Sequence, residues 1–140
     1  MRAYILGGLI ACGILLAGGR MAAHHSFAAE FDSEKPITLT GIVTKVEWTN
    51  PHAWIYINVK DKTTGEVTNW GFEMGPPHGL QRRGWRRDTL KIGEEVTVAG
   101  SLAKNGAKRM NASKVTMTST GARPGETLDA ASSGSSEKVD

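Results

Sequence analysis

From residue 37 onward the chain contains several short runs in which apolar and polar residues alternate, and β-branched and aromatic residues are frequent in these runs. A period of two is typical of a half-buried β-strand, because successive side chains point to opposite faces of a sheet. The alternation predicts five strands, at Ile37–Trp48, Ala53–Val59, Val67–Met74, Glu95–Ala103 and Lys108–Met117.

The first of these runs changes phase along its length. Its apolar residues occupy odd positions up to Leu39 and even positions from Ile42 onward, and Gly41 lies at the change. A glycine at a phase change indicates a β-bulge, which bends a strand around the corner of a barrel. We therefore expect a bulge near Gly41.

A short helix is predicted between the third and fourth strands. Gly75-Pro76-Pro77 ends the third strand, and Pro77 favours a helix through Arg83 because the first helical turn does not need its N–H group. Three strands, a helix and two strands form the oligonucleotide- and oligosaccharide-binding (OB) fold, a five-stranded Greek-key barrel. The predicted fold class is thus all-β, an OB-fold-like barrel with one short helix. The alternative is a small β-sandwich, which usually has about seven strands.

The first residues have the profile of a signal peptide. Arg2 supplies a positive start, and Ala3–Gly19 is uncharged and rich in Leu, Ile, Ala and Gly. Small residues at 22 and 23 favour cleavage after Ala23, which would remove the segment 1–23 and leave a periplasmic or secreted bacterial protein. One alternative is an uncleaved anchor, although the stretch is short against the ~20 apolar residues that a bilayer needs. The other is lipoprotein cleavage at Cys12.

Removal of the signal peptide limits the chemistry of the mature chain. Cys12 is the only cysteine, so its loss excludes disulfides, thiolate metal sites and thiol nucleophiles. The formal charge falls from +3 to +1 because Arg2 and Arg20 leave with the signal. A nearly neutral exported protein is not expected to bind nucleic acid.

One domain, residues 24–118, is predicted to precede a C-terminal tail. Residues 119–140 are mainly Ser, Gly, Ala, Thr and charged residues, and Leu128 and Val139 are their only large aliphatic residues. Such a segment cannot bury enough apolar area to offset the entropy lost on ordering. We predict that the tail is disordered.

The histidines are the first candidate site. If cleavage follows Ala23, His24 presents a free α-amine and an imidazole, and these two nitrogens can close on one metal ion. Nitrogen ligands in a tetragonal plane suit Cu(II). His52, in the loop between the first two strands, is the expected third donor, and His25 is a weaker one because adjacent residues point apart. In the alternative interpretation, His24 and His25 take up metal adventitiously and His52 only hydrogen-bonds its own loop.

Aromatic residues near the same loop are the second candidate site. Trp48 and Trp54 flank the Asn50-Pro51-His52 loop, and Tyr56 shares the predicted face of Trp54. Such rings could stack on a sugar or another ligand with an apolar face. Core packing is the alternative for each of them.

Arginines form the third candidate site. Arg82 and Arg83, with Arg86 and Arg87, surround Gly84-Trp85, and guanidinium groups bind carboxylates and phosphates. The alternative is a solvated helix face. Recognised catalytic motifs are missing from the sequence, so we do not expect an enzyme. The residues together predict an exported ligand-binding protein, with copper as its specific ligand, or alternatively an envelope module that binds a protein or glycan without metal.

Several short strings resemble an uncharacterised family of small exported bacterial proteins. They are His24-His25-Ser26-Phe27, Leu39-Thr40-Gly41, Thr49-Asn50-Pro51-His52-Ala53-Trp54 and Arg82-Arg83-Gly84-Trp85. The resemblance runs from about Ala23 to Met117, and the tail departs from it. It implies export and a barrel fold, and it carries no activity that can be transferred to this chain.

Overall fold

The computed structural model describes residues 25–118 and 125–131. The predicted signal peptide, His24 and most of the predicted tail therefore lie outside the described residues. The elements are α2 (His25–Glu30), β1 (Phe31–Glu47), β2 (Trp54–Lys60), β3 (Val67–Glu73), α3 (Pro77–Arg82), β4 (Glu95–Ala103), β5 (Arg109–Met117) and β6 (Thr127–Asp129).

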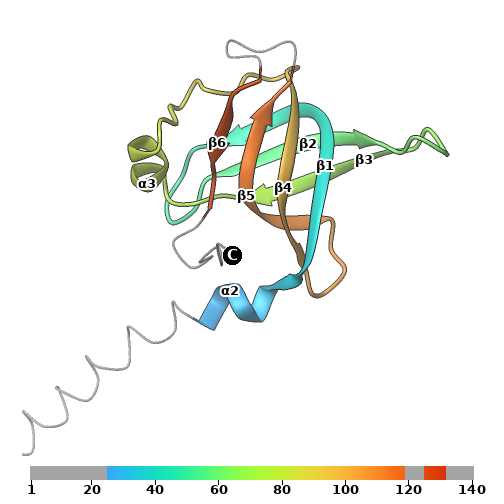
Figure 1. Cartoon of the computed structure of the whole chain (residues 1–140), viewed down its shortest axis with the longest axis horizontal. Coiled ribbons are helices and arrows are strands. Elements are labelled where there is room, and N and C mark those ends of the chain that lie inside the picture. Colours follow the sequence, from blue (N-terminus) through green and yellow to red (C-terminus); the bar gives the residue numbers. More distant parts are fainter. Residues whose placement is uncertain (1–24, 119–124, 132–140) are drawn as a thin grey trace, which may run out of the picture.

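Five of the strands form a closed ring (Figure 1). The order β3-β2-β1-β4-β5 is antiparallel throughout, and a parallel pairing of Gly71–Glu73 in β3 with Arg109–Asn111 in β5 closes the ring. Helix α3 lies between β3 and β4 in the chain. These features confirm the predicted all-β fold, a five-strand barrel with a short helix after its third strand.

The inward faces of the strands supply the core. Alternation places Ile55 and Ile57 of β2 inside, where both are fully buried, while Trp54 and Tyr56 face outward. The largest side chains with almost no exposure are Phe72, Ile55, Ile57, Met74, Leu80, Met110, Met117, Val43, Val96, Val98 and Val115. One continuous core therefore fills the barrel and extends under α3.

The bulge predicted near Gly41 lies further along β1. The β1–β2 register shifts between Val43 and Lys45, which leaves Thr44 as the extra residue, whereas Gly41 pairs with β4 in continuous register. A Cβ atom at Gly41 would lie 2.3 Å from the carbonyl oxygen of Asn58. The glycine therefore permits a close backbone approach of β2, and the phase change has its cause at Thr44.

The prediction that everything after residue 118 is disordered is wrong for residues 127–129. These residues form β6, which pairs with β5 through Thr116↔Thr127, Val115↔Leu128 and Lys114↔Asp129 (Figure 1). Leu128 is only 8% exposed and joins the core. Composition did not predict this strand because the average over the segment is polar, whereas the burial of the single side chain of Leu128 against the core stabilises the short strand.

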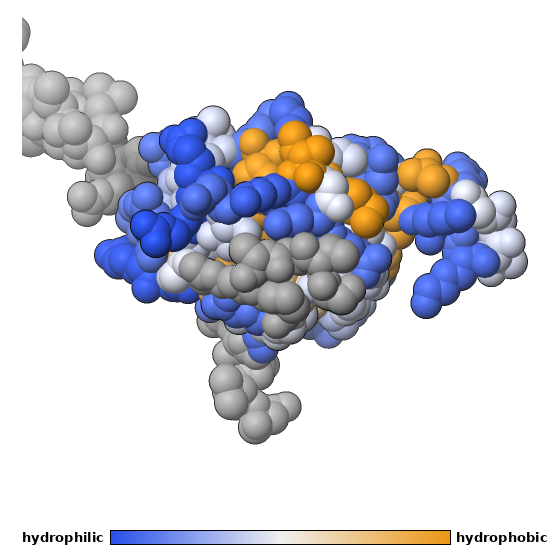
Figure 2. All heavy atoms as spheres, turned by 90° about the horizontal axis from the view of Figure 1, so that it is seen from above, coloured by the Kyte–Doolittle hydropathy of each residue, from blue (hydrophilic) through white to orange (hydrophobic). Residues whose placement is uncertain are grey.

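The surface carries little contiguous apolar area in the view of Figure 2, where small orange patches lie among hydrophilic side chains. Among the described residues the exposed large apolar side chains are Ile42, Val67 and Ile92. Within residues 25–118 and 125–131, no helix has the length and apolar character needed to cross a membrane.

Candidate functional site

The outer face of β2 presents two stacked aromatic side chains. Trp54 and Tyr56 are two residues apart on one strand, so they share a face, and their ring centroids are 6.3 Å apart at an interplanar angle of 22°. Both rings are partly exposed. We call this pair the aromatic platform.

A glycine on the neighbouring strand leaves room for the Tyr56 ring of the platform. Gly71 of β3 pairs directly with Tyr56, and a Cβ atom there would lie 3.2 Å from the Tyr56 ring. The Tyr56 ring therefore lies against the β3 backbone, where any larger residue would push it outward.

Charged residues on β1 flank the platform. Glu47 and Lys45 are the cross-strand partners of Trp54 and Tyr56, respectively. The Tyr56 hydroxyl donates a hydrogen bond to Glu47 at 3.1 Å, Lys45 pairs with the same carboxylate, and the Lys45 ammonium lies 5.3 Å from the Tyr56 ring centroid. The hydrogen bond from Lys45 lowers the pKa of Glu47. Burial, followed by the hydrogen bond to Glu47, raises the pKa of Tyr56.

Arg109 covers the other ring of the platform. It begins β5, directly opposite Gly71, and its guanidinium carbon lies 4.6 Å from the Trp54 ring centroid. The same guanidinium pairs with Glu30 at the end of α2, at 3.3 Å. This cation–π contact and ion pair connect α2 to the platform.

His52 lies at the edge of the platform, in the loop between β1 and β2. Its Nδ1 is 3.1 Å from the carbonyl oxygen of Met74 and 2.8 Å from Oε1 of Glu73. Both partners can only accept while Glu73 is ionised, so Nδ1 carries the proton. In the neutral ring Nε2 is then unprotonated and able to bind a metal or accept a hydrogen bond. The alternative interpretation, in which His52 hydrogen-bonds only its own loop, is wrong, because the partners of its side chain lie at the end of β3.

Glu73 is the most buried carboxylate of this group. It pairs with Trp54 across β2 and β3, and its side chain is 14% exposed. Burial raises the pKa of Glu73, and the nearby charge of Glu30 acts in the same direction, whereas His52 and Arg109 lower it. The site thus alternates acidic and basic groups around two rings.

Trp48, predicted to lie with the platform, instead packs partly buried against the core. His25 is the first residue of α2, and His24 lies outside the described residues. In the described part of the chain, no group of three or more His, Cys, Asp or Glu side chains is arranged to hold a metal ion. Of the three predicted copper ligands, His52 is the one whose side-chain contacts the structure describes.

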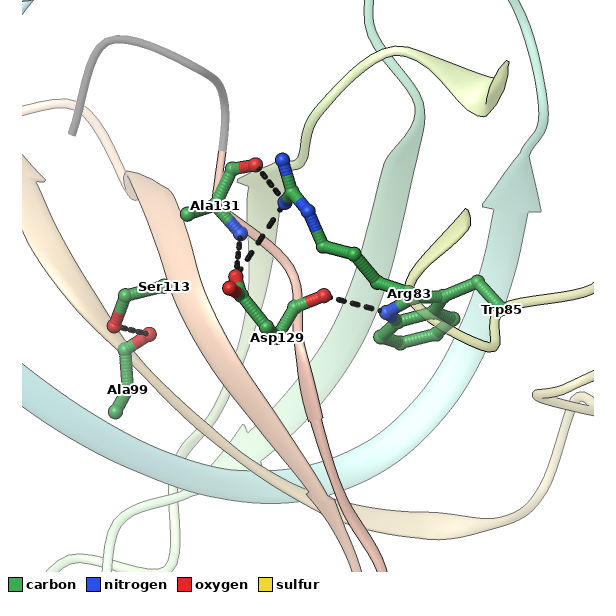
Figure 3. Close-up of polar contacts among 6 residues, drawn as sticks. All are labelled: Arg83, Trp85, Ala99, Ser113, Asp129 and Ala131. Atoms are coloured by element: carbon green, nitrogen blue, oxygen red, sulfur yellow. Dashed lines mark hydrogen bonds and ion pairs between the residues drawn. The ribbon is translucent and has the colours of Figure 1, made fainter. Parts of the chain in front are cut away.

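The arginines divide into two groups. Arg83 donates to Asp129 Oδ1 and to the carbonyl oxygen of Ala131, so it holds the β6 segment (Figure 3). Arg82 is exposed at the end of α3. Other exposed arginines face an open hollow of about 680 Å³ lined by Gln81, Gly84, Trp85, Arg86, Arg87 and Asp88.

Five charged residues of the site were not among the predicted ones: Glu30, Lys45, Glu47, Glu73 and Arg109. Lys45 and Glu47 are two residues apart, as are Trp54 and Tyr56, so each pair lies on one face of its own strand. The sequence does not show that the two pairs lie on the same face of the sheet, which depends on the β1–β2 register. Arg109 reaches Trp54 only through the parallel β3–β5 pairing, for which the sequence contains no local signal.

Comparison with known proteins places the chain in a family. It matches no curated protein and no solved structure. The model of one family matches residues 13–113, which include every residue of the platform and its charged surroundings and end within β5. This match agrees with the resemblance noted from the short sequence strings, and the chain belongs to the family of unknown function DUF6152.

Proposed function

We propose that this protein is exported to the bacterial envelope and binds a glycan chain on the outer face of β2 and β3. The observation that carries the proposal is the partly exposed Trp54–Tyr56 pair, with rings 6.3 Å apart, between charged residues of three neighbouring strands. In OB barrels, oligosaccharides and oligonucleotides bind at strands two and three and at the loops that precede strands two and five. His52 and Arg109 lie at those two loops.

A glycan suits this face better than a nucleic acid does. The cations Lys45 and Arg109 are each paired with a carboxylate, Glu47 and Glu30, and Glu73 adds a further acid. A phosphate backbone requires a surplus of positive charge, which the face does not offer. Sugar hydroxyls, in contrast, can donate to carboxylates and accept from cations while the apolar side of the sugar ring contacts the exposed part of the Trp54–Tyr56 pair that Arg109 leaves uncovered.

The test is calorimetric titration of the exported chain with N-acetylglucosamine oligomers and with oligomers of an acidic sugar. Stacking on one aromatic ring contributes about 1–3 kcal/mol, so we expect Trp54→Ala to weaken binding by roughly tenfold or more. Ile92→Ala, which removes an exposed apolar side chain in the turn before β4, is the control and should bind like the wild type. Absence of binding to every oligomer, or equal affinity of the Trp54 variant, would reject the proposal.

Copper binding is a second candidate function, favoured by the orientation of His52. Histidine ligands of metals commonly donate their other ring N–H to a carboxylate or a backbone carbonyl, which fixes the tautomer. His52 has both partners, Glu73 and the Met74 carbonyl, on Nδ1. The remaining donors would be the α-amine and imidazole of His24 after cleavage, in the arrangement expected from the sequence.

For this candidate we expect the neutral His52 ring to carry its proton on Nδ1, observed by long-range ¹H–¹⁵N NMR correlations. Glu73→Gln should loosen that orientation and weaken Cu(II) binding by about tenfold, and His52→Ala should weaken it further. His78→Ala, an exposed histidine of α3, is the matched control.

The N-terminus must be tested as well, by intact-mass analysis of the exported protein and by titration of a chain with one additional N-terminal Ala before His24. If that chain binds Cu(II) as tightly as the cleaved one, or if mass analysis places the first residue elsewhere, the copper candidate fails and the glycan proposal is unaffected.

A further inference from the structure

A groove beside β5 is already filled by an extended peptide, the chain's own β6 segment. One side of the groove is the edge of β5 beyond its pairing with β3, and the other is the connection that contains Arg83, Gly84 and Trp85 (Figure 3). The segment 125–131 lies between them.

Main-chain hydrogen bonds run along both sides of the segment. On the β5 side, Met117 N–H donates to Glu126 O and Ala130 N–H donates to Ser113 O, at 2.9 and 2.8 Å. On the other side, Gly75 N–H donates to Ala130 O at 2.9 Å. This is the hydrogen-bond pattern by which a sheet edge accepts an added strand.

Side chains of the groove contact particular positions of the segment. Leu128 is 8% exposed, and its Cδ2 would be 3.8 Å from a Cβ atom at Gly84. Trp85 Nε1 donates to the carbonyl oxygen of Asp129 at 2.8 Å, and Arg83 donates to the Asp129 carboxylate and to Ala131 O. The positions that the groove contacts are thus an aliphatic residue, an aspartate and two small residues.

The family match separates one wall of the groove from its occupant. The match to the family ends at residue 113, so Gly75, Arg83, Trp85 and Ser113 lie within it and the whole segment 125–131 lies outside it. The side chains that bind the segment, Arg83 and Trp85, therefore lie in the matched part of the chain, whereas the β5 residues that pair with β6, 114–116, lie outside it together with the occupant.

We propose that this groove is a strand-acceptor site for an extended segment of a partner protein with the order aliphatic residue, aspartate, small residue. Residues 127–131 occupy the site in cis and mimic that partner. Strand β6 has three residues, so a partner that offers a longer strand with the same order makes more main-chain bonds and displaces it. The attached segment competes at a high effective concentration, which makes the cis strand a selectivity filter against short or poorly matched peptides.

The first experiment uses the full chain and a fluorescein-labelled peptide with the sequence of residues 125–131. Leu128→Ser weakens the cis strand, and we expect the peptide to bind this variant at least about tenfold more tightly than the wild type, because competition from the attached segment is reduced. Binding should shift the Trp85 indole N–H signal, and Arg83→Gln in the same background should weaken it. A peptide with serine in place of its leucine is the control. A folded Leu128→Ser variant that does not bind the peptide overturns the proposal.

Hydrogen exchange on the wild type decides the question if Leu128→Ser does not fold. A displaceable strand opens without the barrel, so the amides of Ala130 and Met117, which bond between β6 and β5, should exchange faster than amides inside β1 and β4. Exchange of these amides only at the rate of global unfolding would show that β6 is a permanent part of the core, and the proposal would then fail.

Discussion

Replacing Gly100 by alanine should destabilise the barrel by about 3 kcal/mol or more. Gly100 lies in β4 at the register shift toward β5, and a Cβ atom there would be 2.0 Å from the carbonyl oxygen of Asn111 and 2.9 Å from its carbonyl carbon. These neighbours are backbone atoms of a central strand, so the clash can be relieved only if β4 and β5 separate. Urea unfolding followed by circular dichroism measures the loss.

Gly79→Ala is the matched control for this substitution. Gly79 lies in α3, where a new Cβ atom would meet only Pro76 at an ordinary 3.5 Å, and alanine favours the helical backbone by up to about 1 kcal/mol over glycine. We expect the control to unfold at an equal or higher urea concentration than the wild type. If both variants unfolded at the same concentration, close packing of β4 on β5 at Gly100 would be contradicted.

Replacing Phe72 by alanine should cost about 3–5 kcal/mol of unfolding free energy. The side chain is fully buried on the inner face of β3, at the position that pairs with Met110 across the parallel junction that closes the ring. Its removal leaves a cavity among fully buried core side chains, at the three-residue pairing that closes the ring. Thermal and urea unfolding both report this loss.

Val67→Ala on the same strand is the control for Phe72. Val67 is 55% exposed, and exposed substitutions usually change stability by about 0.5 kcal/mol or less. The NMR signals of Phe72→Ala should in addition broaden or shift most strongly in β5. A loss below about 1 kcal/mol would mean that the ring is not closed through a packed β3–β5 junction.

Local sequence pattern predicted most of the strands because each carries its own periodicity. The observed β4 has the predicted bounds, and β2, β3 and β5 differ from their predictions by a residue or two. The same alternation was enough to place Trp54 and Tyr56 together on one face, since residues two apart on a strand share a side whatever the tertiary structure. Pro77 likewise determined the start of α3 through its fixed backbone geometry.

Features that depend on which strands meet were not predictable in this way. The bulge was expected near Gly41 because the apolar pattern changes phase beside that glycine, yet the extra residue is Thr44, and the position of a bulge is determined by the register with β2. Trp48 was grouped with Trp54 because the two flank one loop, but a loop reverses direction and leaves Trp48 against the core. Arg109 meets Trp54 across strands far apart in the chain.

The sequence by itself determined the five strands of the barrel, the short helix, and the sharing of one strand face by Trp54 and Tyr56, because these follow from backbone geometry within a few residues. Tertiary structure alone decided that Arg109 and Glu73 join that face, that Nδ1 of His52 is held at the end of β3, and that residues 127–129 form a strand. Each of these contacts depends on a partner distant in sequence. Leu128 can be buried, and His52 can bond Glu73 and Met74, only after the barrel has folded and brought those partners together.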